Sequence, residues 1–159
     1  MPTAKQKVDP SSPHVREEGV VSVYENGAGL FAQTIDVRRH RMFSDEPPSL
    51  GGNDMGPTPY DYLLAGLGAC TSMTLRLYAE RKGWPVRRIE VRLYHEKIHA
   101  DDCADCETVE GRIDRIMRII DIDGDLSPEQ RKRLHEIADM CPVHKTLTHE
   151  VRIVTRLSH

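Results

Sequence analysis

Two cysteines of this 159-residue chain stand in settings where a thiol could do chemistry. Cys70 lies in an uncharged segment, residues 62–75, on an apolar stripe with helical spacing. A free cysteine at such a position is ordinarily a small core residue. A reactive thiol needs a nearby cation or helix N-terminus, because the thiolate is the nucleophile. The cluster Arg38-Arg39-His40-Arg41 could supply that cation.

Cys141 lies in the segment M-C-P-V-H-K and falls in line with Leu134 and Ile137 on the apolar side of a second helical pattern. The residue before a proline is disfavoured in a helix, so we expect Cys141 at a helix boundary. If the two helices pack together, Cys70 and Cys141 can meet between them. Two unrelated core cysteines are the alternative that the pattern leaves open.

A third group, His95, His99, Cys103 and Cys106, has the spacing H-x3-H-x3-C-x2-C and the residue types that bind zinc. On a strand, the two histidines would lie about 13 Å apart at roughly 3.3 Å per residue, too far for one ion. Cys103 and Cys106 with His99 therefore stay the zinc candidates. The same two cysteines could instead be a surface redox pair, or incidental thiols in a polar loop.

The elements that must position these residues follow from periodicity and turn signals. The helix that carries Cys70 is predicted from Pro59 to about Lys82, apolar on almost every side and started by a Thr58–Asp61 capping box. Strands are predicted at residues 20–24, 29–37, 39–44, 88–100, 112–123 and 149–157, with a Gly- and Pro-rich loop at 45–59 and a second helix from Ser127 to about Met140. The predicted fold class is α+β, in the order βββ-α-ββ-α-β.

The composition indicates which kinds of partner and which cellular location to expect. The net charge is only −3 with 30% charged residues, so we expect no nucleic-acid partner. The uncharged segment is shorter than the roughly 18 residues of a membrane span, so we expect no membrane partner. Residues 1–18 are polar and predict a flexible tail without a secretory signal, followed by one domain at 19–159. We therefore expect a cytoplasmic protein whose cysteines are not a structural disulfide framework.

The stretch G-P-T-P-Y-D-Y-L-L-A-G-L-G-A-C-T-S-M-T-L, followed later by M-C-P-V-H-K-T-L, resembles the OsmC/Ohr family of osmotically inducible and organic hydroperoxide resistance proteins. The resemblance covers roughly residues 20–157. The segments G-W-P and H-E-K-I-H-A-D-D-C-A-D-C are similar to the YhfA-like branch of the family. The resemblance implies two central helices and sheets completed in an intertwined homodimer, whose partner would help to bury the apolar helix.

The same resemblance implies a function in the stress response, namely a thiol-dependent peroxidase that reduces organic hydroperoxides without a cofactor. Cys70 matches the peroxidatic cysteine and Cys141 the resolving cysteine. Peroxide would oxidise Cys70 to a sulfenic acid, Cys141 would condense with it to a disulfide, and a dithiol reductant would reopen that bond.

The chain departs from the family pattern at the residues that activate the first thiol. Tyr60 stands where the characterised peroxidases carry a Glu, and Asp61 beside it is the candidate carboxylate. No residue matches the family's activating Arg by motif, so His40 and Arg41 are the candidates. These departures favour the alternative function, a non-catalytic OsmC-like module that binds an apolar ligand, or zinc at the Cys103/Cys106 loop.

Overall fold

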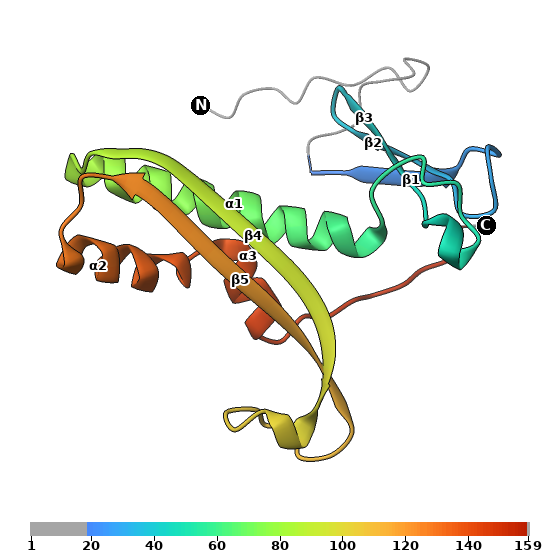
Figure 1. Ribbon diagram of the computed structural model, residues 1–159. Helices are drawn as coiled ribbons and strands as arrows, with labels where there is room; N and C mark the ends of the chain where they lie inside the picture. Colours follow the sequence, from blue (N-terminus) through green and yellow to red (C-terminus); the bar gives the residue numbers. More distant parts are fainter. Residues whose placement is uncertain (1–18, 159) are drawn as a thin grey trace, which may run out of the picture. The chain divides into compact units, whose positions relative to one another are not determined.

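The computed structural model describes residues 19–158, so the predicted flexible tail at 1–18 lies outside the described residues. The chain divides into two compact units between Tyr62 and Leu63. The first unit contains a three-stranded sheet, and the second contains a long two-stranded hairpin with helices packed on it (Figure 1). The predicted α+β class is confirmed. No helix among the described residues is long and apolar enough to cross a membrane.

The first unit is built on an antiparallel sheet in the order β1-β2-β3, so the three predicted strands are present, although the second begins at Gln33 and not at residue 29. β1 (Val21–Glu25) pairs with β2 (Gln33–Val37), and β2 pairs with β3 (His40–Ser44). The loop after β3 contains one short 3-10 helix, η1 (Pro48–Leu50).

Asp45 fixes the path of the loop between β3 and the first long helix. Its buried carboxylate accepts the backbone N–H groups of Glu46 at 2.8 Å, Asn53 at 3.0 Å and Met55 at 3.3 Å. Burial opposes ionisation of this group, but the three donors outweigh it and lower the pKa of Asp45. The long loop is therefore an ordered part of the unit.

α1 (Pro59–Lys82) has the predicted bounds and the predicted capping box. The Thr58 N–H donates to the Asp61 carboxylate at 2.9 Å, and the Asp61 N–H donates to the Thr58 hydroxyl at 3.2 Å. Gly83 follows with a φ of +65°, a left-handed conformation that a glycine adopts without strain and that ends the helix.

α1 is buried on one face only, so the prediction of a helix buried on almost every side is wrong for the single chain. The buried face carries Leu67, Gly68, Thr71, Leu75 and Ala79. The opposite face leaves Met73 71% exposed and Leu77 53% exposed. The reason is that the hairpin of the second unit covers one side of the helix and nothing in the described chain covers the exposed side chains.

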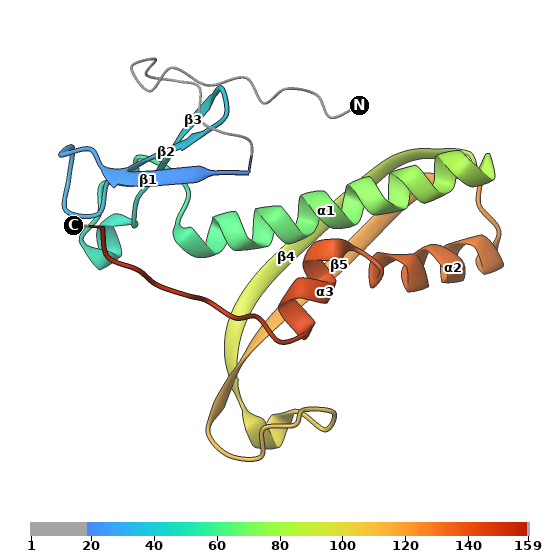
Figure 2. The same ribbon diagram turned by 180° about the vertical axis from the view of Figure 1, so that it is seen from behind.

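The hairpin consists of β4 (Val86–His99) and β5 (Arg112–Gly124), as the sequence predicts. The two strands pair antiparallel from Val86↔Gly124 to His99↔Arg112. At the far end they are joined by η2 (Ala100–Asp102) and a loop. The two opposite views show α1 and α3 on the same face of this hairpin (Figure 1, Figure 2).

The C-terminal part contains two helices where one was predicted. α2 (Pro128–Ala138) begins at the predicted Ser127 capping box, in which the Gln130 N–H donates to the Ser127 hydroxyl at 3.2 Å. It ends two residues earlier than Met140, and α3 (Pro142–Thr148) follows. Pro142 starts α3, because its fixed φ suits the first helical position.

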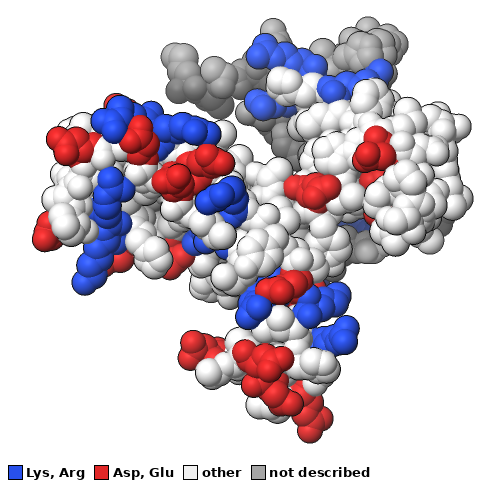
Figure 3. All heavy atoms as spheres, in the orientation of Figure 1, with Lys and Arg blue, Asp and Glu red and all other residues white. Residues whose placement is uncertain are grey.

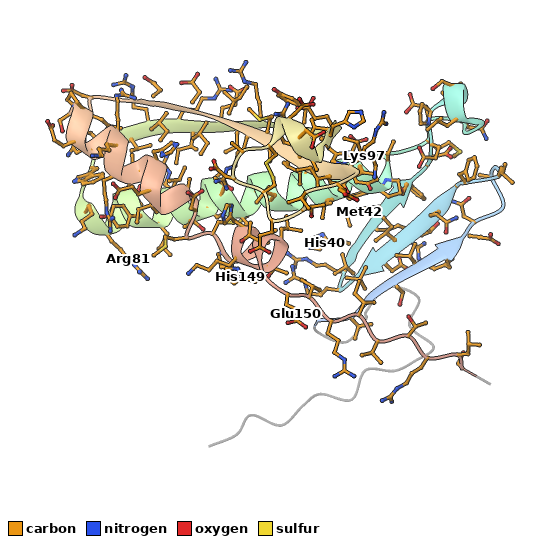
Figure 4. All side chains as sticks on the ribbon, turned by 90° about the horizontal axis from the view of Figure 1, so that it is seen from below. His40, Met42, Arg81, Lys97, His149 and Glu150 are labelled. Carbon is orange, nitrogen blue, oxygen red and sulfur yellow. A yellow bond between two sulfur atoms is a disulfide. The ribbon has the colours of Figure 1, made fainter. Side chains whose placement is uncertain are left out.

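The predicted strand at residues 149–157 is wrong for the described chain. The segment leaves α3 at His149 and Glu150 and joins no sheet (Figure 4). Its alternating apolar side chains are exposed, with Ile153 at 86% and Leu157 at 88%. A strand needs a neighbour to accept its backbone hydrogen bonds, and no described strand edge pairs with this segment.

The core of the second unit joins α1 and α2 to the hairpin. Its buried members are Leu75, Ala79, Val86, Leu134, Ile137 and Ala138. Partly buried hydrophobic residues of β4 and β5 pack against this cluster, among them Ile89 and Ile120. One shared apolar core therefore holds α1, which carries Cys70, and α2, whose C-terminal end leads to Cys141.

We predict that Leu134→Ala destabilises the protein by about 3 kcal/mol, because it leaves a cavity at a fully buried position. The expected loss in Tm is roughly 10 °C. Urea and thermal unfolding measure both quantities. Val109→Ala, at a side chain 78% exposed, is the matched control and should leave stability within about 0.5 kcal/mol of the original. Equal effects of the two changes would contradict the assigned core.

Candidate functional site

The structure brings Cys70 and Cys141 together. Cys70 lies on α1 and Cys141 immediately before α3, and their side chains lie near enough for each to shift the pKa of the other. Cys141 is fully buried and Cys70 is partly exposed. Of the two interpretations that the sequence leaves open, the meeting of the thiols is the correct one, and two unrelated core cysteines are excluded.

Local chain geometry explains the position of Cys141. α2 closes with a tight turn in which the Met140 N–H donates to the Ile137 carbonyl at 2.9 Å. Pro142 then starts α3, and Cys141 becomes its N-cap. The His144 backbone N–H donates to Cys141 Sγ at 3.5 Å. The predicted helix boundary at Cys141 is thus confirmed, and the sulfur faces the free N–H groups of the helix that begins there.

The two thiols titrate as a pair. Burial raises the pKa of Cys70, and its contact with Cys141 raises it further. Burial also opposes ionisation of Cys141, but hydrogen bonds from the Cys70 thiol and from the His144 and Val143 backbone N–H groups lower its pKa. The shifts therefore favour loss of the first proton from Cys141 and oppose loss of a second proton from Cys70, because two thiolates would then lie side by side.

Arg118 places a guanidinium beside this pair. From β5 it donates to the Thr71 hydroxyl at 3.0 Å, to the Ala138 carbonyl at 3.2 Å and to the Asp139 carboxylate at 2.6 Å. Its side chain is only 13% exposed. The Thr71 hydroxyl in turn contributes to lowering the pKa of Cys141. Thr71, whose hydroxyl also donates to the Leu67 carbonyl at 2.8 Å, therefore contacts both Arg118 and the thiol pair.

Arg118, Thr71 and His144 are functional candidates that the sequence reasoning missed. A signal for Arg118 was present, since Ile116, Ile120 and Ile122 occupy alternate positions of β5 with Arg118 among them. A charged side chain in that row must find partners inside the protein. Thr71 carries no such signal, because its role depends on residues distant in sequence.

A cavity of about 430 Å³ is lined by residues near the two cysteines in the sequence, although neither cysteine is itself a lining residue. Its walls include Leu67, one helical turn before Cys70, and His144, whose backbone caps Cys141. The full lining adds Asp114, Ile116, Met117, Arg118, Leu147 and Thr148. The cavity is mainly apolar, with the Arg118 guanidinium and the Asp114 carboxylate among its lining groups, which suits a small apolar molecule that carries a polar end.

The other predicted site residues lie in the first unit. Arg41 donates two hydrogen bonds to the buried Asp36 carboxylate, at 2.8 and 3.0 Å. These hydrogen bonds raise the pKa of Arg41. His40 is exposed on β3, and the Asp61 carboxylate is engaged in the capping box. A role of these residues toward Cys70 stays a prediction.

The predicted zinc candidates are arranged differently from a metal centre. Cys103 and Cys106 are joined by a disulfide, in which neither sulfur is a thiolate ligand. His95 lies on β4 and bonds the Asp114 carboxylate at 2.7 Å across the hairpin. Among the described residues, no group of three or more His, Cys, Asp or Glu side chains is placed to hold a metal ion.

The protein is thus a small α+β protein in which one thiol lies on α1 and a second lies at the start of α3. The OsmC-like protein profile matches residues 51–156. The chain therefore belongs to the OsmC-like family, as the motifs around Cys70 and Cys141 indicate. No curated protein matches the chain in sequence.

Solved structures support the same fold. An OsmC-like protein from Mycoplasma pneumoniae superposes with a TM-score of 0.62 and 21% identity over 80% of this chain and 85% of its own. An organic hydroperoxide resistance protein from Elizabethkingia anophelis gives 0.59 and 18% over 80% and 86%. An organic hydroperoxide resistance protein OsmC from Legionella pneumophila gives 0.58 and 17% over 81% and 88%.

We predict opposite pKa changes when each thiol is removed from the pair. Cys141→Ala should lower the pKa of Cys70, because a neighbour that raises it is gone. Cys70→Ala should raise the pKa of Cys141, because a hydrogen-bond donor to its thiolate is gone. The pH dependence of alkylation by iodoacetamide, followed by mass spectrometry in a Cys103→Ser/Cys106→Ser background, measures both. Shifts of the same sign would contradict the shared hydrogen bond.

Proposed function

We propose that this protein is a thiol-dependent peroxidase that reduces organic hydroperoxides. The observation that carries the proposal is the nearness of Cys70 and Cys141 in an OsmC-like chain. Disulfide formation needs two sulfurs that can approach to bonding distance, and two interacting thiols favour that approach. The names of the structural neighbours, which include hydroperoxide resistance proteins, point the same way.

In the proposed reaction, the two thiols have different tasks. The buried Cys141 thiolate takes the Cys70 proton as Cys70 Sγ attacks the peroxide, whose O–O bond breaks. Cys70 becomes a sulfenic acid, and the departing alkoxide takes the proton and leaves as an alcohol. Cys141 then attacks the sulfenic sulfur, which releases hydroxide and forms the disulfide. A dithiol reductant restores both thiols and leaves as its own disulfide.

The cavity of about 430 Å³ supports an organic rather than an inorganic peroxide. Leu67, Ile116, Met117 and Leu147 offer apolar contacts for an alkyl or aryl group. Arg118 and His144, which line the same cavity, can bind the polar end of the molecule. Hydrogen peroxide has no apolar group, so it would gain no binding energy from the apolar lining of the cavity. We place the reaction in the cytoplasm, where dithiol reductants keep such a pair reduced.

We predict that one equivalent of cumene hydroperoxide converts the reduced protein to a Cys70–Cys141 disulfide, visible by peptide mass spectrometry. Cys70→Ser should reduce turnover to the uncatalysed rate. Cys141→Ser should stop the reaction at the Cys70 sulfenic acid, which dimedone traps. Cys103→Ser is the control and should form the Cys70–Cys141 disulfide at an unchanged rate. Unchanged turnover of Cys70→Ser would refute the proposal.

A second candidate, an apolar-ligand module, is favoured by a hollow of about 360 Å³ over the sheet of the first unit. It is lined by Val21, Val23, Gln33, Ile35, Val37, Met42, Ser44, Pro59 and Tyr62. This candidate would be preferred if cumene hydroperoxide formed no disulfide while a fluorescent fatty acid bound with one-to-one stoichiometry and Ile35→Asp abolished that binding.

We also propose that the protein acts as a homodimer. The single chain leaves two apolar surfaces uncovered, namely the Met73/Leu77 face of α1 and the segment after α3. Exposed contiguous apolar surface of this kind ordinarily marks an interface. The segment at residues 149–157 has the alternation of a strand but no strand beside it, and the α1 face has the small residues that allow another helix to approach closely.

We predict a solution mass of twice the 18.1 kDa of one chain, measured by light scattering coupled to size-exclusion chromatography. Removal of residues 149–159 should give the mass of one truncated chain, because it deletes one of the two surfaces. Ile153→Asp should weaken the dimer in the same direction, and Val109→Asp, at an exposed loop position, should not. A single-chain mass for the full protein across the measurable concentration range would exclude the dimer.

A further inference from the structure

The hairpin loop holds a second pair of sulfurs that the proposed peroxidase reaction does not use. Cys103 and Cys106 form a disulfide in the loop between β4 and β5. Both residues are partly exposed, in contrast to the buried Cys141. The loop lies at the end of the hairpin remote from α2, as the two opposite views show (Figure 1, Figure 2). It therefore forms a site separate from the Cys70/Cys141 pair.

This disulfide contributes little to holding the loop. It links residues only three apart, and the stabilisation from a cross-link grows with the length of the loop that it closes. The loop is already closed by the β4–β5 ladder and by the Ala100 N–H, which donates to the Gly111 carbonyl at 2.9 Å. The Cys103 N–H also donates to the Ala100 carbonyl at 3.0 Å. Loss of the S–S bond leaves all of these hydrogen bonds in place.

The surroundings of the disulfide are strongly acidic. Residues 101–110 contain no Lys or Arg and carry five carboxylates, which are Asp101, Asp102, Asp105, Glu107 and Glu110. Their side chains gather at the hairpin end of the molecular surface, drawn in red (Figure 3). A concentrated negative charge raises the local concentration of cations and lowers that of anions, so it selects among thiols that approach the sulfurs.

We propose that Cys103 and Cys106 are a second redox centre, a surface disulfide that exchanges with thiol reductants bearing positive charge. An attacking thiolate displaces one sulfur of the pair and forms a mixed disulfide with the other. A second thiol of the reductant attacks the mixed disulfide and leaves as oxidised reductant. The pair gains two electrons and two protons and becomes a dithiol. This inference does not depend on the peroxidase proposal, because it concerns other sulfurs.

The test uses the full-length Cys70→Ser/Cys141→Ser protein, in which Cys103 and Cys106 are the remaining cysteines. Reduction by cysteamine, which is cationic, is compared with reduction by 3-mercaptopropionate, which is anionic, at equal thiolate concentration and low salt. Quenching by alkylation followed by mass spectrometry gives the rates. We expect cysteamine to react at least about 10-fold faster, with the ratio falling as salt is raised.

A charge-neutralised variant provides the matched control. Asp101→Asn, Asp105→Asn and Glu107→Gln together should remove most of the preference for cysteamine while leaving the disulfide able to form. Equal rates of the two thiols on the unmodified loop would overturn the role of the carboxylates.

Two further measurements distinguish a redox centre at Cys103 and Cys106 from a purely structural disulfide and from a metal site. In buffers of cysteamine and its disulfide cystamine, the pair should populate both the dithiol and the disulfide reversibly. A pair that stays oxidised in millimolar cysteamine would overturn the proposal. So would a reduced pair that retains one equivalent of zinc, lost on His99→Ala and Cys103→Ser, and does not reoxidise.

Discussion

The partly buried guanidinium of Arg118 is the constraint on which the dithiol site depends. A partly buried charge needs hydrogen-bond partners inside the protein. Arg118 donates to the Thr71 hydroxyl on α1, to the Ala138 carbonyl at the end of α2 and to the Asp139 carboxylate. These contacts fix the distance between α1 and the turn that leads to Cys141. The apolar core of the unit brings the helices together, but it does not specify their register. The polar contacts of Arg118 do.

The ionisation of each of the two thiols in this arrangement depends on the ionisation of the other. The proton that Cys70 donates to Cys141 stabilises the Cys141 thiolate, so the more acidic sulfur is the more deeply buried one. Matching residues to a family motif assigns the tasks of attack and resolution but does not reveal this order of ionisation. The order follows from the backbone N–H groups at the start of α3: the Val143 N–H serves both sulfurs, whereas the His144 N–H serves Cys141.

Much of this arrangement could be predicted because it rests on local patterns. The bounds of α1, the two capping boxes and the long hairpin follow from apolar periodicity and from a few turn residues. Cys70 and Cys141 were found because each lies on the apolar side of a helical pattern. Arg118 and Thr71 were missed because their contacts join residues far apart in the chain. The segment after α3 was predicted as a strand from its alternation, but alternation cannot supply the neighbouring strand edge.

The stability of a short helix depends on its N-cap, and the N-cap acceptor of α3 is a sulfur whose charge can change. α3 has seven residues, a length at which isolated helices are marginal in water, and its N-cap acceptor is Cys141 Sγ. A thiolate accepts the His144 N–H strongly, whereas a neutral thiol or a disulfide sulfur accepts it weakly. Each change in the chemistry of Cys141 therefore alters how firmly α3 is folded. The stability of the first turn of α3 is thereby linked to the charge of the Cys141 sulfur.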